Sequence, residues 1–202
     1  MKIVLPTSWN GVTINQFNQL SKIQKLDDDD NFDIVIEILH VLSEVPRPIL
    51  SQVKLHELVK MYKSLDFINE LNFSKELQGF IKIDKQVYKC EFDLSKMNAN
   101  QYMSLKNIIK SGNIVDNIHE ILAIFFIPIG KKFNEISYNK IAELFYTEVS
   151  IDVAYPLAVF FFNLYNAWTS HIAGYTDTKT LMKKSNRSSH STQHLTTTGG
   201  GI

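Results

Sequence analysis

The chain has 202 residues, and its 21 Lys and Arg residues balance its 21 Asp and Glu residues, so the formal net charge is zero. A domain that binds nucleic acid usually carries an excess of cations, because its affinity comes from neutralising phosphates. The balance therefore argues against a specific nucleic-acid partner. Hydrophobic residues make up 45% of the chain, which is sufficient for a folded core.

The length fits one domain, and the cysteine content limits how that domain is held together. Cys90 is the single cysteine, which excludes an intramolecular disulfide framework and a Cys-rich zinc site. The first residues do not resemble a signal peptide, because the apolar run Ile3–Leu5 ends at Pro6. We expect this start to form a short strand or an extended arm.

Helical periodicity dominates the chain. In successive segments the apolar residues recur every three or four positions, which places them on one face of a helix. Prolines and a Ser-Gly-Asn sequence separate several of these segments. The expected helices run from residue 12 or 13 to the Asp run at residue 27, and over residues 32–44, 55–71, 99–110, 115–126, 138–147 and 151–171.

Residues 79–92 follow a different period. Side chains alternate in two runs, Phe80–Asp84 and Gln86–Glu91, with a tight turn at Asp84–Lys85 between them. This pattern predicts a β-hairpin. Cys90 falls on the same face of the hairpin as Tyr88, where a buried and unreactive thiol is the usual outcome.

Together these patterns predict a mainly α fold with six or seven helices and one inserted β-hairpin, which is α+β by strict naming. We expect a single helical domain over residues 1–184. The composition changes at residue 185, after which Ser, Thr and Gly predominate. Residues 185–202 cannot bury enough apolar surface to fold alone, so we expect a flexible tail that a partner can order.

Two groups of residues could suggest a metal site. The run Asp27–Asp30 lacks the Gly and the distal Glu of a calcium loop, and we interpret it as a solvated loop before a helix. His190 and His194 are four residues apart but lie in the low-complexity tail. No His-Glu sequence is followed by the second His of a zinc helix. We therefore predict no metal ion and no cofactor.

Motifs for catalysis are also missing. The chain has no G-x-S-x-G sequence, and Gly130-Lys131-Lys132 matches only the end of a phosphate-binding loop. We therefore predict that the protein is not an enzyme and has no catalytic residues. An enzyme whose site is assembled from residues distant in sequence stays open as an alternative.

The most unusual segment is Val153–Thr176, which has 24 residues without a formal charge. Its apolar positions follow helical spacing, as in a core or interface helix. A membrane anchor is the alternative, because about 20 apolar residues span a bilayer, but several polar residues oppose it. We predict that this helix is buried in the fold or in a homo-oligomer. The predicted protein interface comprises Phe160, Phe161, Phe162, Tyr165 and Trp168.

Several segments resemble small proteins of tailed bacteriophages. They are the opening LPTSWNGVTINQFNQL, the helix end EVPRPIL, the segment DLSKMNANQYMSL after the hairpin, and EILAIFFIP. The similar proteins include morphogenesis and virion proteins of crAss-like and other phages that infect Bacteroidetes, and some tail assembly chaperones. The resemblance covers roughly residues 3–130 and carries no catalytic signature.

The resemblance implies a non-enzymatic structural or virion-associated protein, in the tail or portal region or carried as packaged cargo. Its partners would be other virion or tail proteins, and it would be assembled into the virion in the host cytoplasm. One alternative is a tail assembly chaperone that is absent from the mature virion. A second alternative is a protein anchored in a membrane through residues 153–176.

Overall fold

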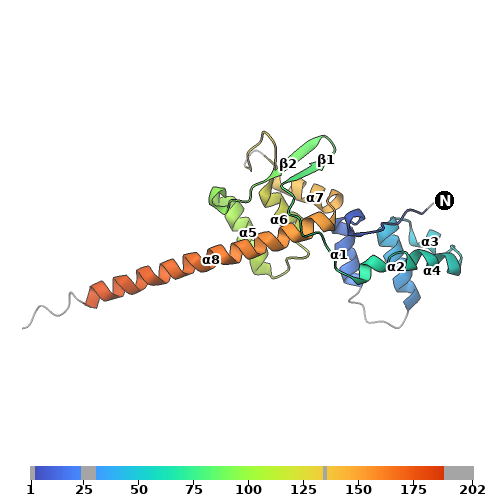
Figure 1. Cartoon of the computed structure of the whole chain (residues 1–202), viewed down its shortest axis with the longest axis horizontal. Coiled ribbons are helices and arrows are strands. Elements are labelled where there is room, and N and C mark those ends of the chain that lie inside the picture. Colours follow the sequence, from blue (N-terminus) through green and yellow to red (C-terminus); the bar gives the residue numbers. More distant parts are fainter. Residues whose placement is uncertain (1–2, 24–30, 134–135, 189–202) are drawn as a thin grey trace, which may run out of the picture. The chain divides into compact units, whose positions relative to one another are not determined.

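The computed structural model describes residues 3–23, 31–133 and 136–188, with side chains up to residue 170 (Figure 1). This part of the chain is mainly helical and contains a small three-stranded antiparallel sheet, which confirms the predicted fold class. The chain divides into two compact units, Met1–Phe160 and Phe161–Ile202. Residues 3–6 form neither helix nor strand, so the short strand that was one of the two expectations for this segment is not present there.

Four helices form the first part of the larger unit. Pro46 and Pro48 end the second of them, as predicted, but they also begin a third, since proline fits the first turn of a helix. The fourth ends earlier than predicted, and a 3₁₀ turn at Asp66–Asn69 follows it. The helices are α1 (Ile14–Ile23), α2 (Asn31–Ser43), α3 (Arg47–Leu50) and α4 (Leu55–Lys63).

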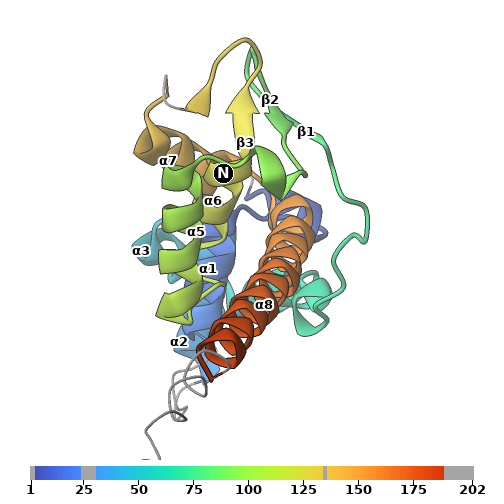
Figure 2. The same ribbon diagram turned by 90° about the vertical axis from the view of Figure 1, so that its left-hand side faces the viewer.

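The predicted hairpin is present as β1 (Phe80–Ile83) and β2 (Gln86–Cys90). A third strand, β3 (Phe126–Pro128), pairs with β2 and was not predicted. It continues directly from α6 (Ile118–Phe125), as Figure 2 shows. The sequence pattern predicted a helix over residues 115–126, which begins three residues too early and ends one residue too late, and its end conceals the start of the strand.

Helix α5 (Ala99–Ser111) follows the predicted range closely. Asn98 and Gln101 cap its start with reciprocal hydrogen bonds, and Gly112 ends it at a positive φ of 75°. Helix α7 (Tyr138–Glu148) is also close to its predicted range and packs on α6.

One face of the sheet packs against the hydrophobic core. Phe145 of α7 is fully buried. Its ring centroid lies 5.0 Å from that of Tyr88 and 6.2 Å from that of Phe126. These edge-to-face contacts join α7 to β2 and β3, and so hold the small sheet against the helices.

A second cluster surrounds Trp9. This side chain is 5% exposed, and its Nε1 donates a hydrogen bond to the Glu70 carbonyl at 2.8 Å. Rings of Phe17, Phe67 and Phe73 lie within 5.5 Å of it, measured between centroids. The cluster therefore joins the start of the chain to the segment that leads into β1.

The last helix, α8 (Ile151–Ser188), begins in the larger unit and provides the helical part of the smaller one. An isolated bridge between Thr13 and Ser150 ties its start to the N-terminal segment. The helix was expected over residues 151–171 but continues to Ser188, which includes the first four residues of the expected tail. Residues 189–202 and the Asp27–Asp30 run lie outside the described residues.

Candidate protein interaction surface

The three strands present two chemically different faces. Side chains alternate along a strand, so the register fixes which residues share a face. The inner sheet face is buried except at Gln86, which is half-buried, and consists of Ile81, Ile83, Gln86, Tyr88, Cys90, Phe126 and Pro128. The outer sheet face consists of Phe80, Lys82, Lys89 and Ile129, which are exposed, and of Val87 and Ile127, which are half-buried.

Lysines and apolar side chains alternate across the outer sheet face as well as along it. In one row Lys89 lies between Phe80 and Ile127. In the next row Lys82 lies opposite Val87. Each ammonium group therefore has apolar neighbours on the adjoining strand, and the face is neither a purely charged nor a purely apolar surface.

Two large apolar side chains of this face are unusually accessible. Phe80 and Ile129 are each 57% exposed. Single exposed apolar residues are common on proteins, but these two lie at the two sides of one small sheet. Exposed apolar side chains gathered on one face are typical of a binding surface.

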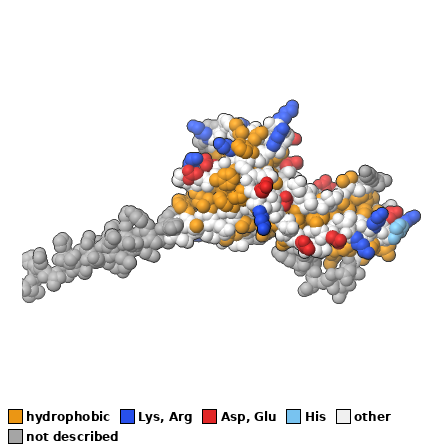
Figure 3. Space-filling view, viewed as in Figure 1, with side chains coloured by type: hydrophobic (Ala, Val, Ile, Leu, Met, Phe, Trp, Pro, Cys, Tyr) orange, Lys and Arg blue, Asp and Glu red, His pale blue; other side chains and the backbone are white. Residues whose placement is uncertain are grey.

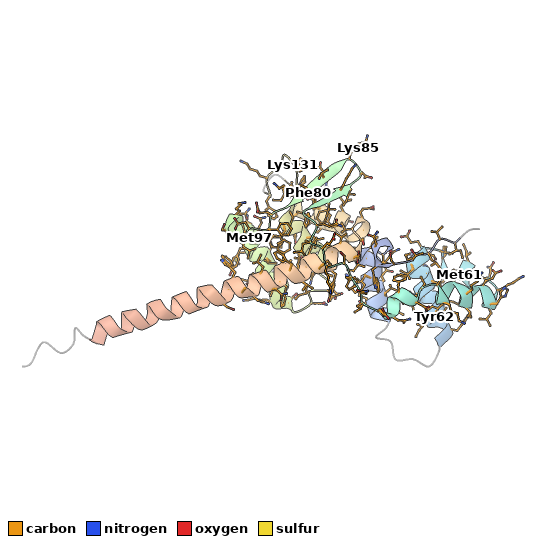
Figure 4. All side chains as sticks on the ribbon, in the orientation of Figure 1. Met61, Tyr62, Phe80, Lys85, Met97 and Lys131 are labelled. Atoms are coloured by element: carbon orange, nitrogen blue, oxygen red, sulfur yellow. The ribbon has the colours of Figure 1, made fainter. Side chains whose placement is uncertain are left out.

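Further lysines border the outer sheet face. Lys85 lies in the β1–β2 turn, and Lys131 and Lys132 follow β3. Figure 3 shows Lys and Arg groups above the hairpin and beside it, with hydrophobic side chains between them. Figure 4 places Phe80, Lys85 and Lys131 around the sheet. The neutral chain thus carries a local excess of positive charge here.

Two acidic residues follow β2 and lie near a cation outside the sheet, whereas Asp84 lies in the β1–β2 turn beside Lys85. Glu91 follows β2, and its carboxylate lies 3.2 Å from the ammonium of Lys96. Asp93 lies 3.9 Å from the same ammonium. These two carboxylates share Lys96, so they offset the lysines of the outer sheet face only in part.

The inner sheet face contains two titratable groups with shifted pKa values. Burial raises the pKa of Cys90 to about 12, and the neighbouring Glu91 adds to this effect. Burial also raises the pKa of Tyr88, with a smaller contribution from Asp84. A thiol with so high a pKa is rarely ionised near neutral pH, so Cys90 is a poor nucleophile there, in line with the prediction.

The residues predicted as an interface divide by burial. Phe161 and Tyr165 are buried within the chain, whereas Phe160, Phe162 and Trp168 are half-buried. The ring of Phe160 makes an edge-to-face contact with Phe92, at 5.7 Å between centroids. Burial of part of this set leaves fewer of its aromatic side chains accessible to a partner.

Candidate metal ligands do not cluster in the described part of the chain, where no group of three or more His, Cys, Asp or Glu side chains could hold an ion. His40 Nδ1 lies 2.8 Å from the Val45 carbonyl. His119 is half-buried, and desolvation lowers its pKa. The Asp27–Asp30 run, His190 and His194 lie outside the described residues.

Trp9, Phe17 and Tyr155 line a cavity of about 560 Å³ together with polar groups that include Asn69 and Asp116. A cavity of this size can hold a small molecule. The buried or half-buried groups whose pKa is shifted do not line it; they are Tyr88, Cys90, His119 and Tyr138. This cavity therefore lacks the convergent shifted groups that mark many catalytic sites.

Comparisons of the chain with protein families, with curated proteins and with solved structures found no match. In the described residues no helix is both long and apolar enough to cross a membrane.

The sequence contained a signal for the outer sheet face. Phe80 falls on the polar side of an alternating run, beside Lys82, and a large aromatic residue there is unexpected for a solvated face. The contribution of Ile127 and Ile129 could not be found in the same way. They belong to a strand that the helical pattern concealed.

Proposed function

We propose that the chain is a non-enzymatic structural or virion-associated protein of a tailed bacteriophage, which acts by assembling with other proteins. In this proposal its partners are other virion or tail proteins, and it is retained in the tail or portal region or as packaged cargo. Self-association into a homo-oligomer is part of the same proposal.

The outer sheet face is the observation that supports a binding role most directly. Phe80 and Ile129 remain 57% exposed although the core beneath the sheet is closed. Exposed apolar groups among cations would be covered if a partner packed on them, and burial of apolar surface is the main favourable contribution to association. The bacteriophage origin rests on the resemblance of residues 3–130 alone.

A tail assembly chaperone would use the same kind of surface. Its client would be a long protein with apolar segments, and it would leave before the particle matures. This alternative differs from the first proposal in where the protein is found, not in the chemistry of its surface. A protein anchored in a membrane through residues 153–176 is the second alternative.

Mass spectrometry of purified virions tests the proposal. We expect peptides of this chain in the particles at a fixed ratio to a known tail protein. Presence in infected cells together with absence from particles would favour the chaperone instead. Recovery only in the detergent-extracted membrane fraction would favour the anchored protein, and both results would contradict a virion component.

Self-association needs a separate measurement, by native mass spectrometry of the full chain. We expect a multiple of 23.2 kDa. Phe162→Ser, in the predicted interface on α8, should lower the population of the oligomer. Phe80→Ser is the matched control, because it removes an aromatic ring from a surface outside that interface. A monomer at micromolar concentration would contradict the homo-oligomer.

A further inference from the structure

Strand β1 lies at one edge of the sheet, since the strand order is β1-β2-β3 (Figure 2). The Cys90 N–H donates to the Gly79 carbonyl at 2.9 Å, which makes this pair a hydrogen-bonded one. In an antiparallel ladder the bonded pairs alternate with non-bonded ones. Phe80 and Lys82 therefore belong to non-bonded pairs, and their N–H and C=O groups point away from β2.

The opposite edge of the sheet is less suited to pairing. Lys89 and Ile127 form a hydrogen-bonded pair, whereas Phe126 and Pro128 belong to non-bonded pairs, so their backbone groups point away from β2 although their side chains lie on the inner sheet face. Pro128 has no N–H to donate, and proline on an edge strand prevents the addition of another strand. An added strand is therefore accommodated at β1 and not at β3.

The lysines decide which kind of strand fits at β1. Two copies of this chain paired through β1 would bring Lys82 and its neighbours together. Like charges on adjacent strands are unfavourable, and a lysine on an edge strand is a common device against self-pairing. A strand that carries carboxylates would instead meet Lys82 directly and gain from Lys85 and Lys89 nearby.

The apolar members of the outer sheet face favour a polypeptide over a nucleic acid. Single-stranded nucleic acids stack their bases on several aromatic side chains. Phe80 is the aromatic residue of this face, and Val87, Ile127 and Ile129 are aliphatic. Aliphatic side chains suit the apolar side chains of a protein partner, which would shield the 57% of Phe80 that is exposed.

We propose that β1 accepts an extended acidic segment of a partner protein as a fourth strand, with its carboxylates facing the lysines of the outer sheet face. The backbone of the added strand bonds to the outward groups of Phe80 and Lys82. On its outward side, an apolar residue lies beside Phe80 and an acidic residue beside Lys82. This proposal rests on the proposed assembly role and names the chemistry of the partner.

Binding is measured on the full chain by fluorescence anisotropy. The probe is a labelled peptide of about nine residues, the length of a long strand. Thr occupies every second position, and Val and Glu alternate at the positions between, so that one face of the strand presents both Val and Glu. A matched peptide with Lys in place of Glu controls for non-specific adhesion. We expect the acidic peptide alone to bind, with an affinity that falls as salt screens the charges.

Two charge variants locate the binding surface. Lys82→Glu combined with Lys89→Glu should weaken binding of the acidic peptide by at least about tenfold. Lys60→Glu combined with Lys63→Glu makes the same change of charge on exposed residues of α4. We expect binding of this matched control to stay within about twofold of the wild-type chain, apart from the general effect of net charge.

A pair of substitutions at one position tests the strand geometry. Phe80→Thr removes the ring and keeps the N–H, whereas Phe80→Pro removes the outward N–H as well. Because that N–H does not bond to β2, proline should leave the sheet intact. We expect Phe80→Pro to bind the peptide about fivefold more weakly than Phe80→Thr, with circular dichroism showing that both variants are folded.

Three other results of these binding measurements would overturn the proposal. Absence of binding at millimolar peptide excludes an acidic strand. Equal losses for the sheet and α4 charge variants would reduce the effect to net charge. Tighter binding of an oligothymidine of about twelve nucleotides, or of vesicles containing phosphatidylserine, would assign the surface to another class of partner. The virion measurement is independent, so the proposed function can fail while peptide binding succeeds, and the reverse.

Discussion

The two faces of the small sheet are built from the same three strands, yet they differ in what surrounds their apolar residues. On the inner sheet face, Tyr88 and Phe126 pack against the buried ring of Phe145. On the outer sheet face, Phe80 has lysines for neighbours and is 57% exposed. The apolar residues of the inner sheet face are buried in the core and stabilise the fold. Those of the outer sheet face make few core contacts.

This difference separates stability from binding within one element. Burial of apolar side chains is the main favourable contribution to folding, and an exposed side chain contributes little of it. Substitutions on the inner sheet face should therefore change the free energy of unfolding, whereas those on the outer sheet face should leave it nearly unchanged. The predictions below test this contrast from the largest expected effect to the smallest.

Phe145→Ala should give the largest effect. The ring is fully buried beneath the sheet and contacts Tyr88 and Phe126. Its removal leaves a cavity and should lower the free energy of unfolding by about 3–5 kcal/mol. Urea denaturation followed by circular dichroism measures this change. Phe145→Leu, with a smaller expected loss, preserves the test if the alanine variant does not fold.

The matched substitution on the other face is Phe80→Ala. It removes the same ring from a side chain that is 57% exposed, so we expect a change within about 1 kcal/mol. Similar losses for Phe80→Ala and Phe145→Ala would contradict the distinction between the two faces.

The contrast also shows how far the sequence could predict the structure. Alternation in residues 79–92 predicted the hairpin and assigned Tyr88 and Cys90 to one side. It did not show which side would be covered, because Phe145 comes from a helix more than fifty residues further along the chain. Phe145 is buried against the inner sheet face by tertiary contacts, which cannot be predicted from a local sequence pattern.

The third strand illustrates a limit of a different kind. Residues 118–125 are apolar nearly throughout, and the next three residues continue this composition, so helical spacing alone gives no reason to end the helix before Phe126. A short apolar run cannot be assigned to helix or strand by periodicity. Pairing with β2 decides it here, and the outer sheet face thereby acquires Ile127 and Ile129.

Cys90 makes the inner sheet face sensitive to high pH. Its pKa is raised from 9.0 to about 12, mainly by burial and then by Glu91. Between these values the unfolded chain loses the thiol proton while the folded chain retains it, so stability is full below pH 9 and falls as the pH rises toward 12. The expected loss is about 1 kcal/mol per pH unit in this window.

Cys90→Ala is the control for this effect, because Tyr88 also has a raised pKa and contributes in the alkaline range. Urea denaturation of both proteins at a series of alkaline pH values gives the comparison. We expect the difference in stability between wild type and Cys90→Ala to shrink as the pH rises. A constant difference would show that the thiol ionises equally in both states.

His119 sets the corresponding limit at low pH. It lies on α6, the helix that leads into β3, and desolvation lowers its pKa below 6.5 although Glu120 partly opposes the shift. The unfolded chain therefore takes up a proton first, and stability is lost as the pH falls below 6.5. Acid denaturation should shift to lower pH in His119→Gln. His56→Gln, an exposed histidine on α4, should not shift it.

The smallest expected effect is that of Lys82→Glu on the outer sheet face. Lys82 is diagonal to Lys89 across the hairpin, and Lys85 follows in the turn. A carboxylate in place of Lys82 exchanges repulsion for attraction, so stability should rise by a few tenths of a kcal/mol at low salt. Thermal unfolding with and without added salt measures this gain, because salt should abolish it.

If Lys82→Glu raises the stability and also weakens binding of the acidic peptide, then the lysines destabilise the isolated fold but favour binding of the partner. A clear loss of stability would instead mean that Lys82 supports the sheet, and the two faces would no longer divide folding from binding.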